Sequence, residues 1–170
     1  MSRLSIIMLS FLVAGCGSRE KKYDFKSYPF DQQVIDKLPL YDSIGRVLLQ
    51  NFAVLQNEMK EHSSFDYSFE GTTGLVNPEL PKAMVEKIRS VQAQLGNQFL
   101  FEISVYKDST IRYSVRDSSL KGFDIIARER LSYLPNGGPM QRREAPNKDS
   151  ILNQNWQYWI RFDEREFFEF

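Results

Sequence analysis

Apolar residues recur at helical spacing in two stretches of the chain. The first stretch runs from about Tyr41 to Glu61, after Pro39, and its apolar residues fall three and four positions apart. The second lies between Asn77, a residue type that caps helices, and Gly96, a residue type that ends them. This spacing predicts two helices, each with one buried face. Their apolar stripes are Ile44, Leu48, Phe52, Leu55 and Met59 in the first helix, and Leu80, Met84, Ile88, Val91 and Leu95 in the second.

Apolar and polar residues alternate elsewhere, which is the pattern of half-buried strands. A short strand is expected between the helices, where Phe65, Tyr67 and Phe69 alternate with polar residues. An antiparallel meander is expected after the second helix, with strands at about 99–105, 111–115, 123–134 and 156–163. The long connection before the last strand contains Pro135 and Pro139, and connections of this length are often mobile or functional.

The first hairpin of this meander has one register that puts its apolar residues on the same face. Pairing Val105 with Ile111 also brings the neighbouring apolar residues into opposition. The further pairs are Ile103 with Tyr113 and Phe101 with Val115.

A sheet and helices that each bury one face predict an α+β fold. We expect two helices packed on one face of a curved antiparallel sheet of four or more strands, within a single domain at 31–170. This outline resembles the NTF2-like cones, which often hold a small ligand. It is also similar to the ααβββ lipoproteins of outer-membrane assembly, which act as docking modules. No signature motif of either family is present.

The first sixteen residues have the order of a processing segment. Arg3 precedes an apolar run from Leu4 to Val13, which is too short to span a bilayer but suits a signal peptide. The run ends in Val13-Ala14-Gly15-Cys16, which resembles the lipobox of bacterial lipoproteins. The alternative is an ordinary secretory signal peptide with an incidental cysteine.

The lipoprotein resemblance implies an anchor. Residues 1–15 would be removed, Cys16 would carry the acyl chains (palmitate among them), and 16–30 would form a flexible tether. Gly17 after the cysteine implies the outer membrane by the sorting rule of enteric bacteria. Two or more acyl chains give stable membrane binding where one does not. The implied location is the cell envelope, with the domain facing the periplasm or the cell surface.

The composition excludes several other classes of protein. The chain of 170 residues has one cysteine and one histidine, too few for an internal disulfide or for a zinc site of the usual type. Its 22 basic and 22 acidic residues give no electrostatic case for binding nucleic acid. An apolar content of 42% indicates a folded domain. We therefore expect no cofactor, no metal and no nucleic-acid partner.

Glu129 is a candidate for buried acid chemistry. It falls on the apolar face of its expected strand, between Ala127 and Leu131, and a buried carboxylate often marks a site. In an NTF2-like cavity it would act as a general acid or base in a pocket with Tyr113 and Tyr158. The alternative is a β-bulge that turns Glu129 outward.

The opposite face of the last two strands is a candidate partner surface. Trp and Arg dominate interface hot spots, and Arg stacks on Trp. The alternative is a solvated sheet face with one aromatic shielded by arginine stems. The residues concerned are Arg128, Arg130, Trp159 and Arg161.

The chain shows no pattern of a catalytic nucleophile, so no catalytic residue is assigned. The first functional hypothesis is a non-enzymatic lipoprotein that docks onto another envelope protein. The second is an NTF2-like ligand-binding domain or carboxylate-using enzyme built around Glu129. A filled concave side of the sheet favours the first hypothesis, and a deep pocket there favours the second.

Overall fold

The fold combines a single sheet with helices. The computed structural model describes residues 23–60, 62–69, 80–137 and 147–164. The helical elements are the short 3-10 helix η1 (Phe25–Ser27), α1 (Gln32–Asp36), α2 (Leu38–Gln50), α3 (Phe52–Glu58), α4 (Lys82–Leu95) and the 3-10 helix η2 (Asn97–Phe99). The strands are β1 (Ser64–Ser68), β2 (Glu102–Tyr106), β3 (Ile111–Ser119), β4 (Ile125–Tyr133), β5 (Lys148–Ile151) and β6 (Trp156–Glu164).

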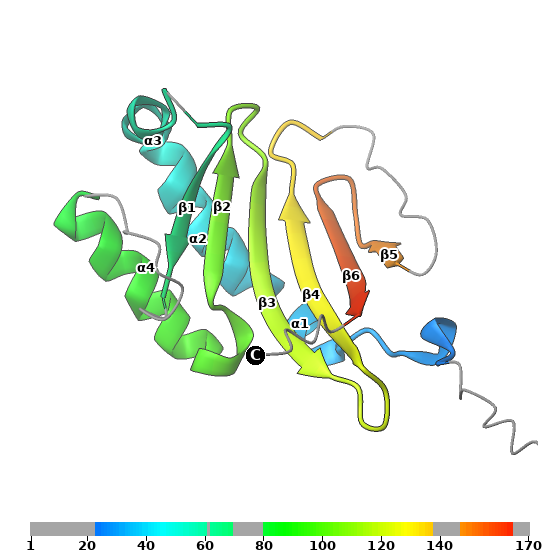
Figure 1. Cartoon of the computed structure of the whole chain (residues 1–170). Helices are drawn as coiled ribbons and strands as arrows, with labels where there is room; N and C mark the ends of the chain where they lie inside the picture. Colours follow the sequence, from blue (N-terminus) through cyan, green and yellow to red (C-terminus); the bar gives the residue numbers. More distant parts are fainter. Residues whose placement is uncertain (1–22, 61, 70–79, 138–146, 165–170) are drawn as a thin grey trace, which may run out of the picture.

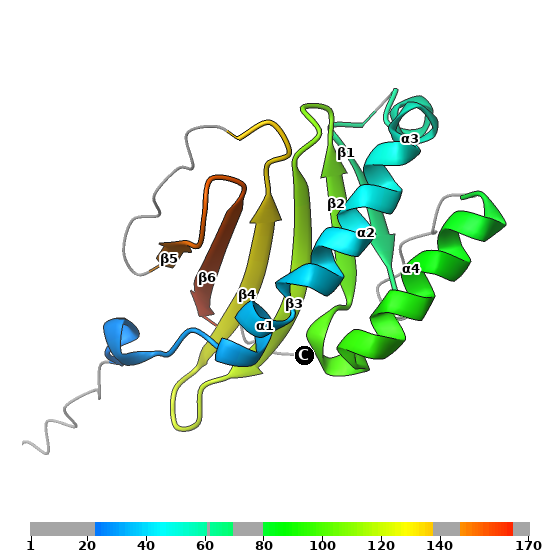
Figure 2. The same ribbon diagram turned by 180° about the vertical axis from the view of Figure 1, so that it is seen from behind.

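Six antiparallel strands form the sheet, in the order β1-β2-β3-β4-β6-β5. Helices α1, α2 and α4 lie on one face of it, in front of the strands in Figure 2 and behind them in Figure 1. The expected α+β class, with helices on one face of a curved antiparallel sheet, is therefore confirmed. None of the helices in the described ranges is long and apolar enough to cross a membrane.

The first expected helix is two helices in the structure. α2 begins at Leu38, and Pro39 lies in its first turn, where the missing N–H of proline costs nothing. The helix ends at Gln50. The next residue, Asn51, caps it, and its side-chain Nδ2 donates to the Val47 carbonyl over 2.8 Å; α3 starts at Phe52. The side-chain amide of Asn51 thus satisfies the Val47 carbonyl near the end of α2, and the chain turns there. In the second expected helix, Asn77 lies outside the described residues.

The expected register of the first hairpin is confirmed for two of its three pairs. Val105 lies opposite Ile111, and Ile103 lies opposite Tyr113. The third pair, Phe101 with Val115, is not part of the ladder, because β2 begins only at Glu102 and the register of β3 shifts between Ser114 and Arg116. Val115 is the extra residue of this β-bulge.

Two elements of the second half differ from the expectation. Phe99 ends the 3-10 helix η2 and does not start a strand. The long connection after β4 contains β5, which pairs with β6 at the edge of the sheet. β5 has the sequence Lys-Asp-Ser-Ile, so it is too short and polar to show alternation.

The segment 23–30 belongs to the domain, although it was expected as the end of a flexible tether. Its aromatic rings pack on the sheet, with ring centroids 4.8 Å apart for Phe25 and Phe162 and 5.0 Å apart for Phe30 and Tyr158. The ammonium of Lys148 donates to the backbone carbonyls of residues 26 and 28. Four apolar side chains in eight residues bury enough surface to fix this segment. The domain therefore begins no later than Tyr23.

The core lies between the sheet and the helices. α2 and α4 contribute completely or almost completely buried side chains, and the strands contribute most of the residues predicted for their apolar faces. Phe101 is an exception, since its ring lies 5.3 Å from the Arg130 guanidinium on the other side of the sheet. From the helices these are Ile44, Leu48, Met84, Ile88 and Leu95; from the strands, among others, Ile103, Val105, Ile111, Tyr113, Leu131 and Tyr158.

Candidate functional site

Glu129 is a buried carboxylate on the helix-facing side of the sheet. Its residue exposure is 0%, and three side chains donate hydrogen bonds to it. The Arg116 guanidinium does so through Nε and Nη2 at 2.9 and 2.5 Å, and the Tyr28 hydroxyl at 3.1 Å. The Tyr158 hydroxyl donates to the second carboxylate oxygen. A carboxylate with this set of donors is compensated for the loss of water.

The bulge in β3 brings the cation to this acid. The pairing shifts from Ser114 opposite Arg130 to Arg116 opposite Glu129, so Arg116 faces the helices. Strict alternation would point its side chain to the other face. The bulge considered for β4 as a way to turn Glu129 outward is absent, since β4 pairs with β6 without a shift from Ile125 to Tyr133.

Arg116 also fixes the start of α1. Its Nη1 lies 2.9 Å from a carboxylate oxygen of Asp31, and the other oxygen of Asp31 accepts from the Gln33 N–H at 2.8 Å as the helix cap. The Asp31 N–H in turn donates to the Tyr158 hydroxyl over 3.3 Å. The cluster of Tyr28, Asp31, Arg116, Glu129 and Tyr158 therefore joins the N-terminal segment to three strands.

The tyrosines of this region stay protonated over a wide pH range. Burial raises the pKa of Tyr158, and the hydrogen bond to Glu129 and the carboxylate charge raise it further. Burial and the charge of Glu129 also raise the pKa of Tyr28 and Tyr41. The pKa of Tyr113 is raised well above its ordinary value, mainly by burial. Each hydroxyl therefore serves as a hydrogen-bond donor and not as a base.

The three residues proposed for a pocket lie in the packed core. Tyr113, Glu129 and Tyr158 are each 0% exposed, so none of them lines a cavity that a water molecule could enter. The Tyr113 hydroxyl donates to the Tyr41 carbonyl at 3.0 Å, and its ring stacks on Trp156. The carboxylate of Glu129 is held by donors on both of its oxygens and does not reach solvent. This arrangement provides structural stabilisation and no accessible general acid.

The arginine–tryptophan face is the side of the sheet opposite the helices. We define it by Arg112, Arg128, Arg130, Trp159 and Arg161. Together with Glu102, Ser104 and Ser114 they line a hollow of about 260 Å³ on this side. No helix of the described ranges covers it, as the view onto the strands in Figure 1 shows. The structure thus brings together the four residues expected as a partner surface.

Most of the cations on this face are paired. Arg128 lies 3.1 Å from Asp117 and 2.6 Å from Asp163. Arg130 lies 2.8 Å from Asp117, and Arg161 lies 3.0 Å from Asp163. Burial lowers the pKa of the Arg130 guanidinium, and the ion pair with Asp117 offsets part of this effect. The remaining cation is Arg112.

Arg112 is the residue of this face that the sequence did not single out. Its guanidinium lies 5.0 Å from the ring centroid of Tyr106 and 5.3 Å from that of Trp159. It makes no ion pair among the described residues, and its Nε is buried there without a hydrogen-bond partner. The only signal in the sequence was its place between Ile111 and Tyr113, which alternation assigns to the outer face.

Trp159 is less accessible than expected for a contact residue. It lies on the arginine–tryptophan face, but its exposure is only 6% and its Nε1 donates to the Ser132 hydroxyl at 3.0 Å. Arg112 stacks over its ring, which corresponds to the alternative of an aromatic shielded by arginine. A partner would therefore meet the arginine heads first and not the indole.

The remaining candidates give no further site. Cys16 and the lipobox lie outside the described residues. Within the described ranges, no group of three or more His, Cys, Asp or Glu side chains is arranged to hold a metal ion. No family model matches the chain, and no curated protein and no solved structure matches it either.

Proposed function

We propose that the protein is a lipid-anchored bacterial envelope protein whose domain docks onto an acidic segment of another envelope protein. The observation that carries this proposal is the arginine–tryptophan face, where four arginines and one glutamate line a single hollow. Three of these arginines are paired with Asp117 or Asp163, and Arg112 is left to receive a carboxylate from outside. Arginine is well suited to this role because its guanidinium forks onto a carboxylate.

The lipid anchor rests on the resemblance of Val13-Ala14-Gly15-Cys16 to a lipobox. If Cys16 is acylated, only six residues, 17–22, and hence seven Cα–Cα steps, separate it from the start of the domain at Tyr23. A chain of that length spans at most about 25 Å. The domain would then stay at the membrane surface, and its partner would have to lie there too.

The enzymatic alternative has less support. A carboxylate-using enzyme needs a substrate within hydrogen-bond reach of the acid. Glu129 is completely buried and its two oxygens accept from Arg116, Tyr28 and Tyr158. The docking role is therefore the function that the geometry supports best.

Site-directed photocrosslinking in the native membranes tests the docking surface. A photoreactive residue replaces Ser104, which lines the hollow, and in a matched control it replaces the exposed Gln94 on α4, on the other side of the sheet. We expect one adduct of defined mass from position 104, which the control position does not give. The charge reversal Arg112→Glu should abolish it. An adduct that is insensitive to this change, or one that also forms from position 94, overturns the proposal.

The anchor is tested separately by Cys16→Ser. This variant should move the protein from the membrane fraction to the soluble fraction, because the acylated thiol is lost. A variant that still sediments with membranes contradicts the anchor and leaves the docking result unaffected.

A further inference from the structure

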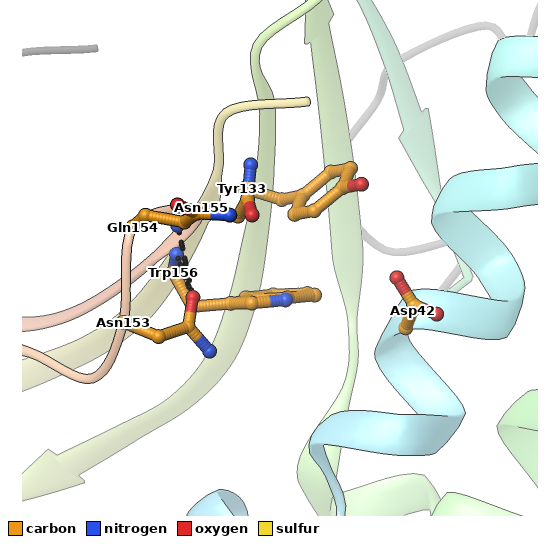
Figure 3. Close-up of a pocket in the computed structure, with 6 residues that line it drawn as sticks. All are labelled: Asp42, Tyr133, Asn153, Gln154, Asn155 and Trp156. Atoms are coloured by element: carbon orange, nitrogen blue, oxygen red, sulfur yellow. Dashed lines mark hydrogen bonds between the residues drawn. The ribbon is translucent and has the colours of Figure 1, made fainter. Parts of the chain in front are cut away.

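A second hollow lies on the other side of the molecule, between α2 and the end of the β4–β6 pair. Its volume is about 500 Å³. Figure 3 shows Trp156 and Tyr133 pointing from the strands towards Asp42 on α2, with Asn153, Gln154 and Asn155 along the rim. This hollow is separate from the arginine–tryptophan face and from the Glu129 cluster.

The lining has a distinctive chemistry. Among the described residues, the lining consists of two aromatic rings, three side-chain amides and one carboxylate, with no lysine, arginine or aliphatic side chain. Amides and carboxylates together offer donors and acceptors for hydroxyl groups. An aromatic ring gives an apolar surface for the C–H groups of the same ligand. This combination fits a neutral ligand with many hydroxyl groups.

Several of these polar groups are available to a ligand. Gln154 is exposed, and within the described chain its side chain makes no hydrogen bond. One carboxylate oxygen of Asp42 accepts hydrogen bonds from Nε and Nη2 of Arg46, at 2.8 and 2.6 Å. The other oxygen remains an acceptor. Trp156 is 5% exposed, and its ring packs against that of the half-buried Tyr133, with the ring centroids 4.8 Å apart.

The rim of the hollow is held in place before any ligand arrives. The Asn153 side-chain oxygen accepts from the backbone N–H groups of Asn155 and Trp156 at 2.9 and 3.0 Å. The Asn155 side chain donates to the Leu134 carbonyl at 2.7 Å, and the Leu134 N–H donates back to the Asn155 carbonyl at 2.8 Å. These bonds tie the turn before β6 to the end of β4. A preformed site loses less entropy when it binds.

We propose that this hollow binds a neutral sugar unit, with Gln154 and the free oxygen of Asp42 bonding its hydroxyl groups and Tyr133 packing on its C–H face. The proposal does not depend on the docking function, because it rests on different residues on a different side of the sheet.

Titration of the full chain in phosphocholine micelles, followed by ¹⁵N–¹H NMR, tests this site. The probes are maltotriose, cellotriose and chitotriose. We expect at least one of them to bind with a Kd of about 1 mM, an affinity that a few hydrogen bonds and one ring contact can supply. The shifts should concentrate on the Trp156 indole and on the backbone of residues 153–155.

Matched variants assign the binding to the hollow. Gln154→Ala and Asp42→Asn should each weaken binding by about fivefold, which corresponds to one lost hydrogen bond. Gln94→Ala, on the exposed side of α4, should leave it unchanged. The proposal is overturned if none of the three sugars binds at about 10 mM. It is also overturned if the shifts fall elsewhere or if both hollow variants bind like the wild type.

Discussion

Arg116 and Glu129 meet across β3 and β4 because one extra residue, Val115, changes the face on which the rest of β3 presents its side chains. The same change moves Asp117 to the opposite face, where it pairs with Arg128 and Arg130. With strict alternation Arg116 would point to the outer face and Asp117 to the core. One bulge therefore sets both the buried ion pair and the charge balance of the arginine–tryptophan face.

Removal of the Glu129 carboxylate should destabilise the domain strongly. Glu129→Ala leaves the Arg116 guanidinium, the Tyr28 hydroxyl and the Tyr158 hydroxyl without their acceptor. Breaking a buried pair in this way costs about 3 kcal/mol or more. Urea denaturation followed by circular dichroism measures the change in the free energy of unfolding.

The matched control is Glu86→Ala on α4. Glu86 faces Lys82 at 3.9 Å, and both side chains are largely exposed. An exposed pair of this kind contributes less than about 1 kcal/mol. If the Glu129 variant were no less stable than this control, the cluster would not be a structural element and the enzymatic alternative would regain support.

The buried tyrosines should make the domain sensitive to alkaline pH. In the folded state the pKa values of Tyr158, Tyr41 and Tyr113 lie above their ordinary value of 10.0, whereas in the unfolded chain they return to it. Above pH 10 the unfolded chain loses protons that the folded chain keeps, so the stability contribution is complete below about pH 10 and falls as the pH rises further.

Two measurements check this expectation. The free energy of unfolding should be lower at a pH above 10 than at pH 8, and tyrosinate absorbance should rise in two phases, the second accompanying unfolding. In Tyr158→Phe the slope of stability against pH should be smaller, since one shifted group is gone. An alkaline slope that is the same in wild type and variant would argue against the contribution of Tyr158.

The parts of the fold that depend on periodicity could be predicted from the sequence. The pairs Val105–Ile111 and Ile103–Tyr113 follow from the burial of one face of each strand, and the structure has them. The residues of the two expected helical stripes all pack in or against the core, although the first stripe is divided between α2 and α3 and Leu80 precedes α4. Alternation along β4 also placed Glu129 on the apolar face, with an outward-turning bulge as the alternative, and Glu129 is buried. These features are local, so they can be derived from neighbouring positions in the chain.

The parts that could not be predicted depend on long-range contacts. A bulge adds one residue without changing composition, so nothing in the sequence marked Val115 as the extra residue or Arg116 as the partner of Glu129. Tyr28 is 101 positions from Glu129, and its segment was assigned to a tether because it lacks a clear period. Trp159 lies on the predicted face, but its low exposure depends on neighbours from other strands, such as Arg112 over its ring and Ser132 at its Nε1.

A methyl group at Gly45 should destabilise the domain as long as Tyr113 keeps its hydroxyl. A Cβ at Gly45 would lie 3.0 Å from the Tyr113 oxygen, which is fixed by its hydrogen bond to the Tyr41 carbonyl. Ala normally gains about 1 kcal/mol over Gly inside a helix. We expect Gly45→Ala to lose that gain and to destabilise the domain by about 1 kcal/mol, as overpacked cores do.

A double-mutant cycle with Tyr113→Phe isolates this contact. The Phe variant removes the oxygen that the new methyl group would meet, so Gly45→Ala should be neutral or stabilising in that background. Urea midpoints of the four proteins give the coupling energy. Equal effects of Gly45→Ala in both backgrounds would mean that another neighbour, such as Ile111 at 3.6 Å, limits the space.

Loss of the Arg112 side chain should expose Trp159. The Arg112 guanidinium lies over the indole at 5.3 Å from its centroid, and such a contact contributes about 0.5–1 kcal/mol at a partly exposed position. In a Trp156→Phe background, where Trp159 is the remaining tryptophan, the emission should be blue-shifted and only weakly quenched by iodide. Arg112→Ala should move the emission to longer wavelength and increase the quenching.

Arg161→Ala is the control for this prediction, because the Arg161 side chain is 51% exposed and pairs with Asp163. It should leave the spectrum unchanged. An unchanged spectrum in Arg112→Ala would show that other neighbours bury the indole and would remove Arg112 as its cover.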